Sequence, residues 1–579
     1  MLESAATSFA SIVMVGIGFG IAGYGYHHYY KTLVLRKMTI AFEPGDPVLE
    51  LAAMSRSVPK HIAGNALDPH FEHPAGKGSG SESSDADGDN LDYTDTDTDN
   101  DNDDDAGDDG RGHYWIRRPE QELVNGIVSG LTIGHYHLFI GEKGTGKSSM
   151  QLDAMAQIDA EGVAMFDAHA DLEIFRIRLG KALNYEFNED YIGGYFSERG
   201  PRETTALLDI ERALNKLEKV AVNRRNATRP GVRRRPLVII VNQMHLIRDD
   251  EDGRDLIELL QQRAEQWAAS GLVTMVFNSD DYWVYERFKQ LAARLEVHSI
   301  QDLSRHQAME TLKRYRWRHF GERVSDDLAS DIYERVGGRL TFLNRVVRSM
   351  DMLWTCRRIM EAEKMWFLGQ CWILGGDMDD DVMDQQKWAA AAMVLAQALV
   401  DKEAEEWESK KQEAAEASEA AKAQGSKKTN AALSQPSGAP HRTWLPSVSL
   451  HEAQQIQTRA DFIREMDRRN LFTIDSHAQV RASSVPMQWA LREICEMPGF
   501  RDHLDATVQR ISDIESLGRT RELVAKDLVL GGHYELSSGK KDGGGNSGSG
   551  SKTEVHFRGW SPHERPSRDP PEPGSGKTT

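Results

Sequence analysis

The residue types most able to do chemistry lie in one short segment, Gly141-Glu142-Lys143-Gly144-Thr145-Gly146-Lys147-Ser148, which Ser149 follows. The spacing matches GxxxxGK[ST], the pattern of phosphate-binding loops. Glycines let backbone N–H groups approach a phosphate chain closely, and a following helix favours negative charge at its N-terminus. We expect Lys147 to reach the β- and γ-phosphates and Ser148 to ligate Mg²⁺. The loop predicts binding of ATP or GTP, with ATP and Mg²⁺ as the expected ligands.

Strands and helices in the required order must position this loop. The apolar run Tyr136–Ile140 precedes it, and the helix-compatible stretch Ser149–Ala160 follows. Short β-like runs then alternate with helical patterns, which is typical of a mostly parallel sheet covered on both faces. The predicted strands are Tyr136–Ile140, Gly162–Phe166, Leu237–Val241, Leu272–Phe277 and Leu295–Ser299. We therefore predict an α/β fold, with a P-loop ATPase core over residues 113–300 and a helical lid over residues 301–376.

The acidic residues expected to support hydrolysis are missing after the predicted strand Leu237–Val241. This strand ends in Asn242 and Gln243, where P-loop ATPases place an Asp that positions Mg²⁺ and often a Glu that activates water. Asn242 can accept a bond from a magnesium-bound water but brings no charge, and Gln243 cannot remove a proton. Loss of a general base costs about 10²- to 10⁴-fold in rate. Acids that would substitute are Glu142, Asp167, Asp171, Asp249 and Asp250, although a solvated loop carboxylate is the plainer interpretation of each.

Three further residues fit nucleotide sensing or turnover. Asn278 directly follows the strand Leu272–Phe277, where its amide would touch the γ-phosphate or the attacking water, or would simply cap the strand. Arg339, in the lid, would reach the phosphates or remain a surface arginine. Arg294 precedes the fifth strand, where an arginine finger would act on a neighbouring subunit of a homo-oligomer.

The N-terminal 37 residues predict a membrane anchor. Phe9–Tyr26 carries no charge, and tyrosines precede the basic residues Lys31, Arg36 and Lys37. A cleaved signal peptide is the alternative, but the basic residues lie on the wrong side for one. The positive-inside rule places the bulk of the chain in the cytosol, as a single-pass protein of an intracellular membrane. A short anchor with a basic C-terminal flank is similar to the signal anchors of the mitochondrial outer membrane.

The net charge of -20 is concentrated in one segment. Residues 82–109 contain 14 acidic residues and no basic one, which leaves 76 acidic against 70 basic residues elsewhere. A juxtamembrane segment, residues 38–73, and an acidic disordered linker, residues 74–112, are therefore predicted before the core. Asn100 and Ala106 stand where an EF-hand needs Gly and Glu, so the linker does not predict specific calcium binding. Three widely spaced cysteines predict neither a disulfide framework nor a zinc site.

The C-terminal part predicts a second domain. A long helix is expected over residues 377–425 and a linker over 426–447. In residues 448–530, two helices (Leu450–Gln457 and Arg459–Asn470) precede two short strands (Leu471–Ile474 and Gln479–Ala482), which is winged-helix order. Residues 531–579 are rich in Gly, Ser, Lys and Pro and predict a disordered tail.

These motifs carry a resemblance to known families. The stretch from Tyr114 to Met350 resembles AAA+ and STAND-type P-loop ATPases, and with Leu450–Asp527 the chain resembles fungal AAA-type ATPases that bear a C-terminal winged helix. The resemblance implies nucleotide-gated movement between core, lid and winged helix. Asn242 and Gln243 depart from the general AAA+ pattern. A weaker similarity runs to the fungal mitochondrial escape protein, another membrane-anchored P-loop protein, but the chain has no RNA-recognition sequence.

Three functions follow from these observations. The first is a membrane-anchored ATPase or ATP-dependent switch acting on protein partners. The second, favoured by Asn242 and Gln243, is a scaffold that binds ATP without turning it over. The third is an ATP-regulated DNA-binding protein, since winged helices often enter the major groove. Residues 448–528 contain 11 Lys/Arg and 13 Asp/Glu, so they lack the basic face that phosphate binding needs, and nucleic acid is the least expected partner.

Overall fold

The computed structural model describes residues 2–56, 118–187, 205–227, 235–373, 383–423, 445–457, 460–529, 533–539 and 552–558. The predicted acidic linker, and the linker 426–447 up to residue 444, lie outside the described residues. The chain divides into two units. One comprises Met1–Trp372 with Ala391–Glu496, and the other comprises Ile373–Ala390 with Met497–Thr579.

The core of the first unit is a parallel sheet of five strands: β1 (Tyr136–Ile140), β2 (Val163–Asp167), β3 (Leu237–Asn242), β4 (Val273–Ser279) and β5 (Leu295–Ser299). Every predicted strand is present, within two residues at each end. The spatial order is β2-β3-β4-β1-β5, which is neither the Rossmann nor the flavodoxin-like order. Because β4 lies between β1 and β3, the residues that follow these three strands meet at one edge of the sheet.

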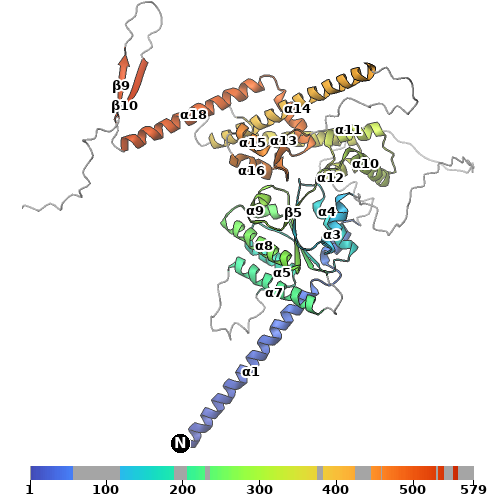
Figure 1. The fold of residues 1–579 in the computed structure, drawn as a ribbon, viewed down its shortest axis with the longest axis vertical. Helices are drawn as coiled ribbons and strands as arrows, with labels where there is room; N and C mark the ends of the chain where they lie inside the picture. Colours follow the sequence, from blue (N-terminus) through green and yellow to red (C-terminus); the bar gives the residue numbers. More distant parts are fainter. Residues whose placement is uncertain are drawn as a thin grey trace, which may run out of the picture. The chain divides into compact units, whose positions relative to one another are not determined.

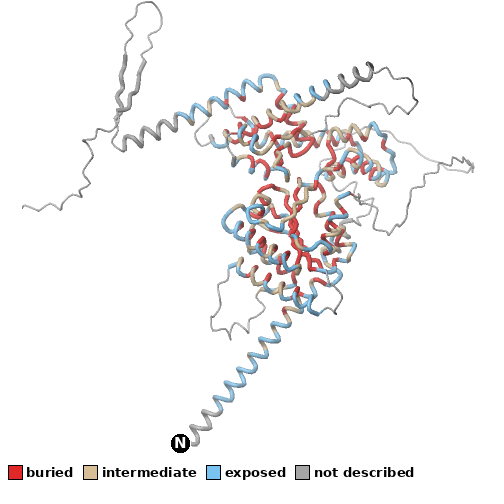
Figure 2. The backbone as a smooth tube through the Cα atoms, viewed as in Figure 1, coloured by how far each residue is buried: buried red, intermediate tan, exposed pale blue. Residues whose placement is uncertain are grey.

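Helices cover both faces of this sheet (Figure 1). On one face α3 (Glu120–Val128) and α4 (Lys147–Gln157) pack against Phe139, Val238 and Val276. On the other, α5 (Leu172–Ala182), α7 (Ala206–Asn226), α8 (Glu251–Ser270) and α9 (Trp283–Leu291) surround Leu138, Ile239 and Phe277. The strands β1, β3 and β4 are buried along their whole length, which Figure 2 shows as the red interior of the core. The prediction of a P-loop α/β core is confirmed.

The N-terminal helix α1 (Leu2–Ile40) corrects the prediction of a membrane anchor. In the part of the chain that the structure describes, no helix has both the length and the apolar content that a bilayer crossing requires. The described part of α1 mixes its apolar residues with five glycines, and with tyrosines and histidines from Tyr24 onward. The predicted N-terminal transmembrane helix, and with it a single-pass protein of an intracellular membrane, is therefore wrong. At its C-terminal end α1 places Met38, followed by Phe42, in the sheet's larger hydrophobic core.

A helical region follows the sheet, in the segment 301–376 for which a lid is predicted. It consists of α10 (Arg305–Phe320), α11 (Asp326–Val336), α12 (Leu340–Val347) and α13 (Met352–Cys371), which share a separate core around Leu312, Ile332 and Val346. A capping box formed by Ser304 and Gln307 begins α10, and Ser325 caps α11.

The winged-helix region contains β6 (Ser447–Ser449), α15 (Leu450–Gln457), α16 (Ala460–Arg468), β7 (Phe472–Ile474), β8 (Gln479–Ala482) and α17 (Val485–Cys495). Its three strands pair antiparallel in the order β6-β8-β7. Helix α17 packs on α11 and α13 of the lid, where the Trp489 indole donates to the carbonyl of Glu334 at 3.1 Å. The sequence analysis identified neither α17 nor β6.

Four more elements belong to the described chain, besides α2 (Pro47–Arg56) near the N-terminus. A long helix, α14 (Met383–Ala423), lies in the segment 377–425 for which one is predicted, and its Glu403 pairs with Arg492 of α17. In the second unit, α18 (Phe500–Val529) precedes β9 (His533–Gly539) and β10 (Lys552–Arg558). The strands β9 and β10 pair antiparallel, within the segment for which a disordered tail is predicted.

Candidate functional site

The phosphate loop runs from β1 into α4 and has the backbone that its glycines predict. Gly144 has φ of +87° and Gly146, which caps α4, has φ of +103°, a region that L-residues with side chains rarely adopt. A Cβ atom on Gly144 would lie 2.5 Å from Oγ1 of Thr341, and one on Gly141 would lie 2.2 Å from the carbonyl oxygen of Ile300. Glycine is therefore required by close contacts with the lid and with the end of β5, as well as by dihedral angles.

Lys147 is buried and folds back over the loop. Its Nζ donates to the carbonyls of Gly141 at 2.7 Å and Glu142 at 2.9 Å, and pairs with Oδ1 of Asp280 at 2.7 Å. The Asp280 carboxylate therefore serves as the counter-ion of the lysine that is expected to hold phosphates. A bound triphosphate would compete with Asp280 for this ammonium group.

Arg118 contacts the phosphate loop, although it was not predicted from the sequence. The buried guanidinium donates to the carbonyls of Thr145 at 2.9 Å and Gln301 at 2.5 Å, so it joins the loop to the segment after β5. Thr145 in turn donates through Oγ1 to the carbonyl of Glu142 at 3.0 Å. Lys143 lies in the same loop and Ser149 in the first turn of α4, and neither side chain joins this network among the described residues.

A buried cluster of amides lies where P-loop ATPases carry their acids. Asn278 donates to Oδ1 of Asn242 and exchanges hydrogen bonds with Gln151 of α4, and all three residues are at most 3% exposed. Ser148 Oγ lies 3.5 Å from Oδ1 of Asn242. The structure thus brings the predicted residues Asn242, Asn278 and Ser148 together at the carboxyl ends of β3 and β4. The cluster offers oxygen ligands but no negative charge.

Gln243 is held apart from this cluster. It is exposed and adopts a left-handed backbone with φ of 56°, as the residue that begins a short 3₁₀ turn, Met244–Leu246. An acid that contacts the site is Asp280, which lies two residues beyond Asn278 and pairs with Lys147. Besides Lys147, Asp280 contacts His245, whose Nε2 lies 3.7 Å from Oδ2 of the carboxylate. Burial lowers the pKa of His245.

The other predicted acids have local structural partners. Asp171 caps α5, and Asp250 caps α8 by accepting from the backbone of Gly253 at 2.8 Å. Asp249 pairs with Arg254 and Arg287, and Asp167 ends β2 with its side chain exposed. Arg294 is exposed and donates to the carbonyl of Gly134 at 3.5 Å. None of these side chains contacts the phosphate loop among the described residues.

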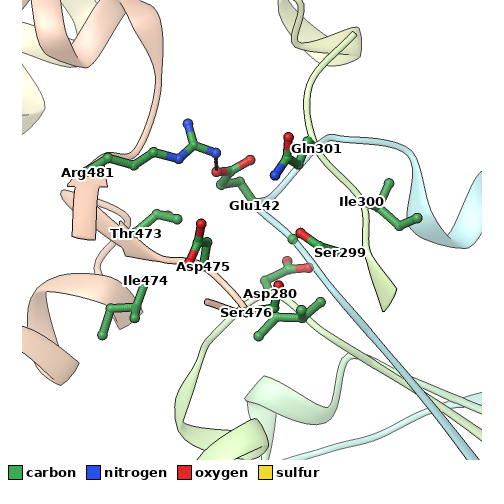
Figure 3. A pocket seen from close by; sticks show the side chains of 12 residues that line it. Glu142, Asp280, Ser299, Ile300, Gln301, Thr473, Ile474, Asp475, Ser476 and Arg481 are labelled. Atoms are coloured by element: carbon green, nitrogen blue, oxygen red, sulfur yellow. Dashed lines mark hydrogen bonds and ion pairs between the residues drawn. The ribbon is translucent and has the colours of Figure 1, made fainter. Parts of the chain in front are cut away.

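Glu142, the second residue of the phosphate loop, joins three parts of the molecule. One carboxylate oxygen pairs with Arg481 of β8 (Figure 3). The other oxygen lies 3.3 Å from Nη2 of Arg339 in the lid. Arg339 is buried; it also pairs with Asp302 at 3.1 Å and donates to the carbonyl of Ser483 at 2.7 Å. The predicted sensor Arg339 therefore contacts the loop through Glu142, and the sequence analysis missed Arg481 altogether.

The β7–β8 hairpin of the winged helix closes over the loop. Its turn, from Ile474 to Ser476, faces Gly141 and Asp280 across a cavity of about 10 Å³ (Figure 3). Such a volume holds about one water molecule. The hairpin thus leaves no room for a larger group beside Gly141 and Glu142.

Two buried carboxyls form the second contact between core and winged helix. Asp467 of α16 accepts from the backbone N–H groups of Tyr282 at 2.8 Å and Ile474 at 3.3 Å. Burial, and then the neighbouring Asp281, raise the pKa of Asp467 well above its usual range. Burial, and then the charge of Asp280, raise the pKa of Asp281 to about 7. Protonated carboxyls at this contact avoid the cost of two buried charges side by side.

Comparison with known proteins gives one family match. Residues 369–515 match the family described as fungal AAA protein, C-terminal winged helix domain. No curated protein is significantly similar to the chain in sequence.

Solved structures that are similar to the chain include a Walker-type ATPase of Pyrococcus abyssi, with 13% identity over 65% of this chain and 96% of that one, and a TM-score of 0.38. AMPPCP-bound DnaA from Aquifex aeolicus has 11% identity over 48% and 80%, with a TM-score of 0.26. The replication initiator DnaA bound to AMPPCP and single-stranded DNA has 11% identity over 69% and 96%, with a TM-score of 0.27. At such TM-scores the sheet order and loop geometry carry the assignment of the core. The family match confirms the resemblance drawn from the sequence: residues 369–515 are similar to the C-terminal winged helix domain of fungal AAA proteins, joined here to a P-loop ATPase-like core.

Proposed function

We propose that this chain binds Mg-ATP at the phosphate loop and acts as a nucleotide-dependent switch on protein partners. The observation that carries the proposal is the pairing of Glu142 with both Arg339 and Arg481, because it links the loop directly to the lid and the winged helix. Lys147, the backbone of residues 141–146 and the N-terminus of α4 supply the phosphate contacts. Ser148 and Asn242 are the oxygen ligands that would hold Mg²⁺, which keeps several of its own waters in such sites.

The switch follows from competition at the loop. A triphosphate brings negative charge to Lys147, so it displaces Asp280 from the ammonium group. It also needs space that the β7–β8 hairpin fills. ATP binding therefore favours a state in which Arg481 leaves Glu142 and the winged helix presents new surface to a partner.

The second candidate function is that of a scaffold that binds ATP and hydrolyses it slowly or not at all. The amide cluster of Asn242, Asn278 and Gln151 favours it, since none of these groups removes a proton. Asp280 is the carboxylate best placed to act as a base once Lys147 has turned to the phosphates.

The winged helix favours a protein partner over DNA. The basic residues Arg464 and Arg468 of α16, and Arg469 just after it, are engaged within the molecule. Arg464 pairs with Glu286 of the core at 2.9 Å, Arg469 pairs with Glu465, and Arg468 lies over the Trp283 ring. A recognition helix needs free basic side chains for phosphates.

Hydrogen exchange of the full chain with and without Mg-ATP tests the proposal. We expect faster exchange in residues 472–482 with ATP and no change in the Lys147→Ala variant. Failure of the wild-type chain to bind ATP would overturn nucleotide binding. ATP binding with unchanged exchange in the hairpin would overturn the switch while leaving nucleotide binding intact.

A further inference from the structure

A group of metal-ligating side chains lies at the end of the sheet opposite to the phosphate loop. His137 of β1 is fully buried, and its partner in the register of β5 is Glu296. His298 follows two residues later on β5 and therefore shares the face of Glu296. His137 precedes Gly141 by four residues, so the group lies about 13 Å along β1 from the loop.

The ligand atoms of these residues already converge. Nδ1 of His137 lies 3.1 Å from Nε2 of His298 and 3.4 Å from Oε2 of Glu296, and the latter two atoms are 3.9 Å apart. A tetrahedral zinc ion with bonds of about 2.0–2.2 Å separates its ligand atoms by about 3.3–3.6 Å. Of the three observed distances, 3.4 Å lies inside this range, 3.1 Å lies just below it and 3.9 Å lies above it.

We propose that His137, Glu296 and His298 bind one divalent transition-metal ion of the zinc type. Two imidazole nitrogens and one carboxylate oxygen suit zinc, whereas magnesium and calcium prefer oxygen ligands alone. The other oxygen of Glu296 lies 3.2 Å from Nδ1 of His135, which orients the carboxylate. Glu296 is 40% exposed, so the fourth coordination position is open to water.

The alternative is a pair of histidines that serves packing alone, and the position of the Glu296 carboxylate argues against it. The stacked rings of His137 and His298 need only each other to pack. Instead, the ligand atoms of His137, Glu296 and His298 all lie within 4.8 Å of one another, and His137 is fully buried.

The metal has a structural role in this arrangement. β5 is an edge strand and is less buried than the other strands, pairing only with β1. A metal ion held between the two strands fixes β5 in register. The segment after β5 carries Asp302, which holds Arg339, and Ile300, whose carbonyl contacts Gly141.

Metal uptake by the full chain tests the site. The protein is dialysed against a chelator, exposed to excess Zn²⁺ and desalted, and bound zinc is measured by mass spectrometry. We expect one equivalent in the wild-type chain, at least tenfold weaker binding in Glu296→Gln and His298→Gln, and no change in His306→Gln, which removes an exposed histidine of α10. Co²⁺ should give the visible absorption of a tetrahedral site.

Thermal unfolding provides a second measurement. Zinc should raise the Tm of the wild-type and His306→Gln proteins and leave that of Glu296→Gln and His298→Gln unchanged, because only binding to the folded site stabilises it. Less than half an equivalent of zinc in the wild-type chain, or equal affinity in the Glu296 and His298 variants, would overturn the proposal.

Discussion

Glu142 and Arg481 form an ion pair between residues that lie 339 positions apart in the sequence. Glu142 is 3% exposed in the phosphate loop and Arg481 is 16% exposed on the winged-helix hairpin, so the pair is largely shielded from water. Arg339 contacts the second oxygen of the same carboxylate. A single residue of the phosphate loop thus contacts both the lid and the winged helix.

Removing Arg481 should increase ATP affinity. Arg481→Ala deletes the winged-helix half of the pair, while Arg339 still neutralises Glu142. Because a closed state lowers apparent affinity by the fraction of molecules that are competent to bind, we expect the apparent Kd for Mg-ATP to fall about tenfold. Fluorescent-nucleotide titration measures it. Lys313→Ala, which removes a surface ion pair within the lid, is the matched control and should leave the Kd unchanged.

Asp280→Asn separates two roles of the Asp280 carboxylate. Loss of its charge frees Lys147 for phosphates, so we expect ATP affinity to be retained or increased. If Asp280 also activates water, single-turnover phosphate release should fall by about 10²-fold or more. Retained hydrolysis together with tighter binding would show that Asp280 acts only as the resting partner of Lys147.

Asn242→Asp should raise hydrolysis. Oδ1 of Asn242 accepts a hydrogen bond from Asn278, and an aspartate keeps this acceptor while adding the charge that positions Mg²⁺. Gln243→Glu alone should have little effect, because Gln243 is exposed and has a left-handed backbone. Single-turnover assays at several protein concentrations measure both the rate and any dependence on a homo-oligomer. An unchanged rate in Asn242→Asp would mean that site geometry, and not the missing acid, limits turnover.

Local sequence was sufficient to predict the core. Short β-like runs of five or six residues predicted every strand of the parallel sheet. The runs of the buried strands are mostly apolar, because such strands are covered on both faces. The phosphate loop was also predictable from local sequence, because its glycines, Lys147 and Ser148 lie in one contiguous segment. The site's other partners were not predictable in this way. Arg118, Asp280 and Arg481 act through contacts made only when distant segments pack together. The left-handed backbone of Gln243 likewise has no sequence signal.

The prediction of a membrane anchor at the N-terminus was wrong for a different reason. Counting charges over Phe9–Tyr26 gave a long uncharged stretch, but absence of charge is not apolar content. Beyond Val13 the described part of α1 alternates apolar residues with glycines and then changes to tyrosines and histidines. Its last turns carry Met38 into the core of the sheet, a tertiary contact that hydropathy does not reveal.

Asp281 should make stability depend on pH. Its folded pKa of about 7 exceeds the unfolded value of about 3.9, so the protonated carboxyl stabilises the fold. This contribution is fully present below about pH 4 and is lost as pH rises through about 7. The Asp281→Asn variant has no carboxyl to ionise, so it should not lose this contribution. Between pH 5 and pH 8 the free energy of unfolding should therefore fall by about 2 to 3 kcal/mol more in the wild type than in the variant. Urea unfolding at both pH values measures the difference, with Asp326→Asn, an exposed carboxylate of the lid, as the control. Parallel pH dependence in Asp281→Asn and wild type would show that Asp281 is ionised in the folded chain and that its contact with Asp467 is not held by a proton.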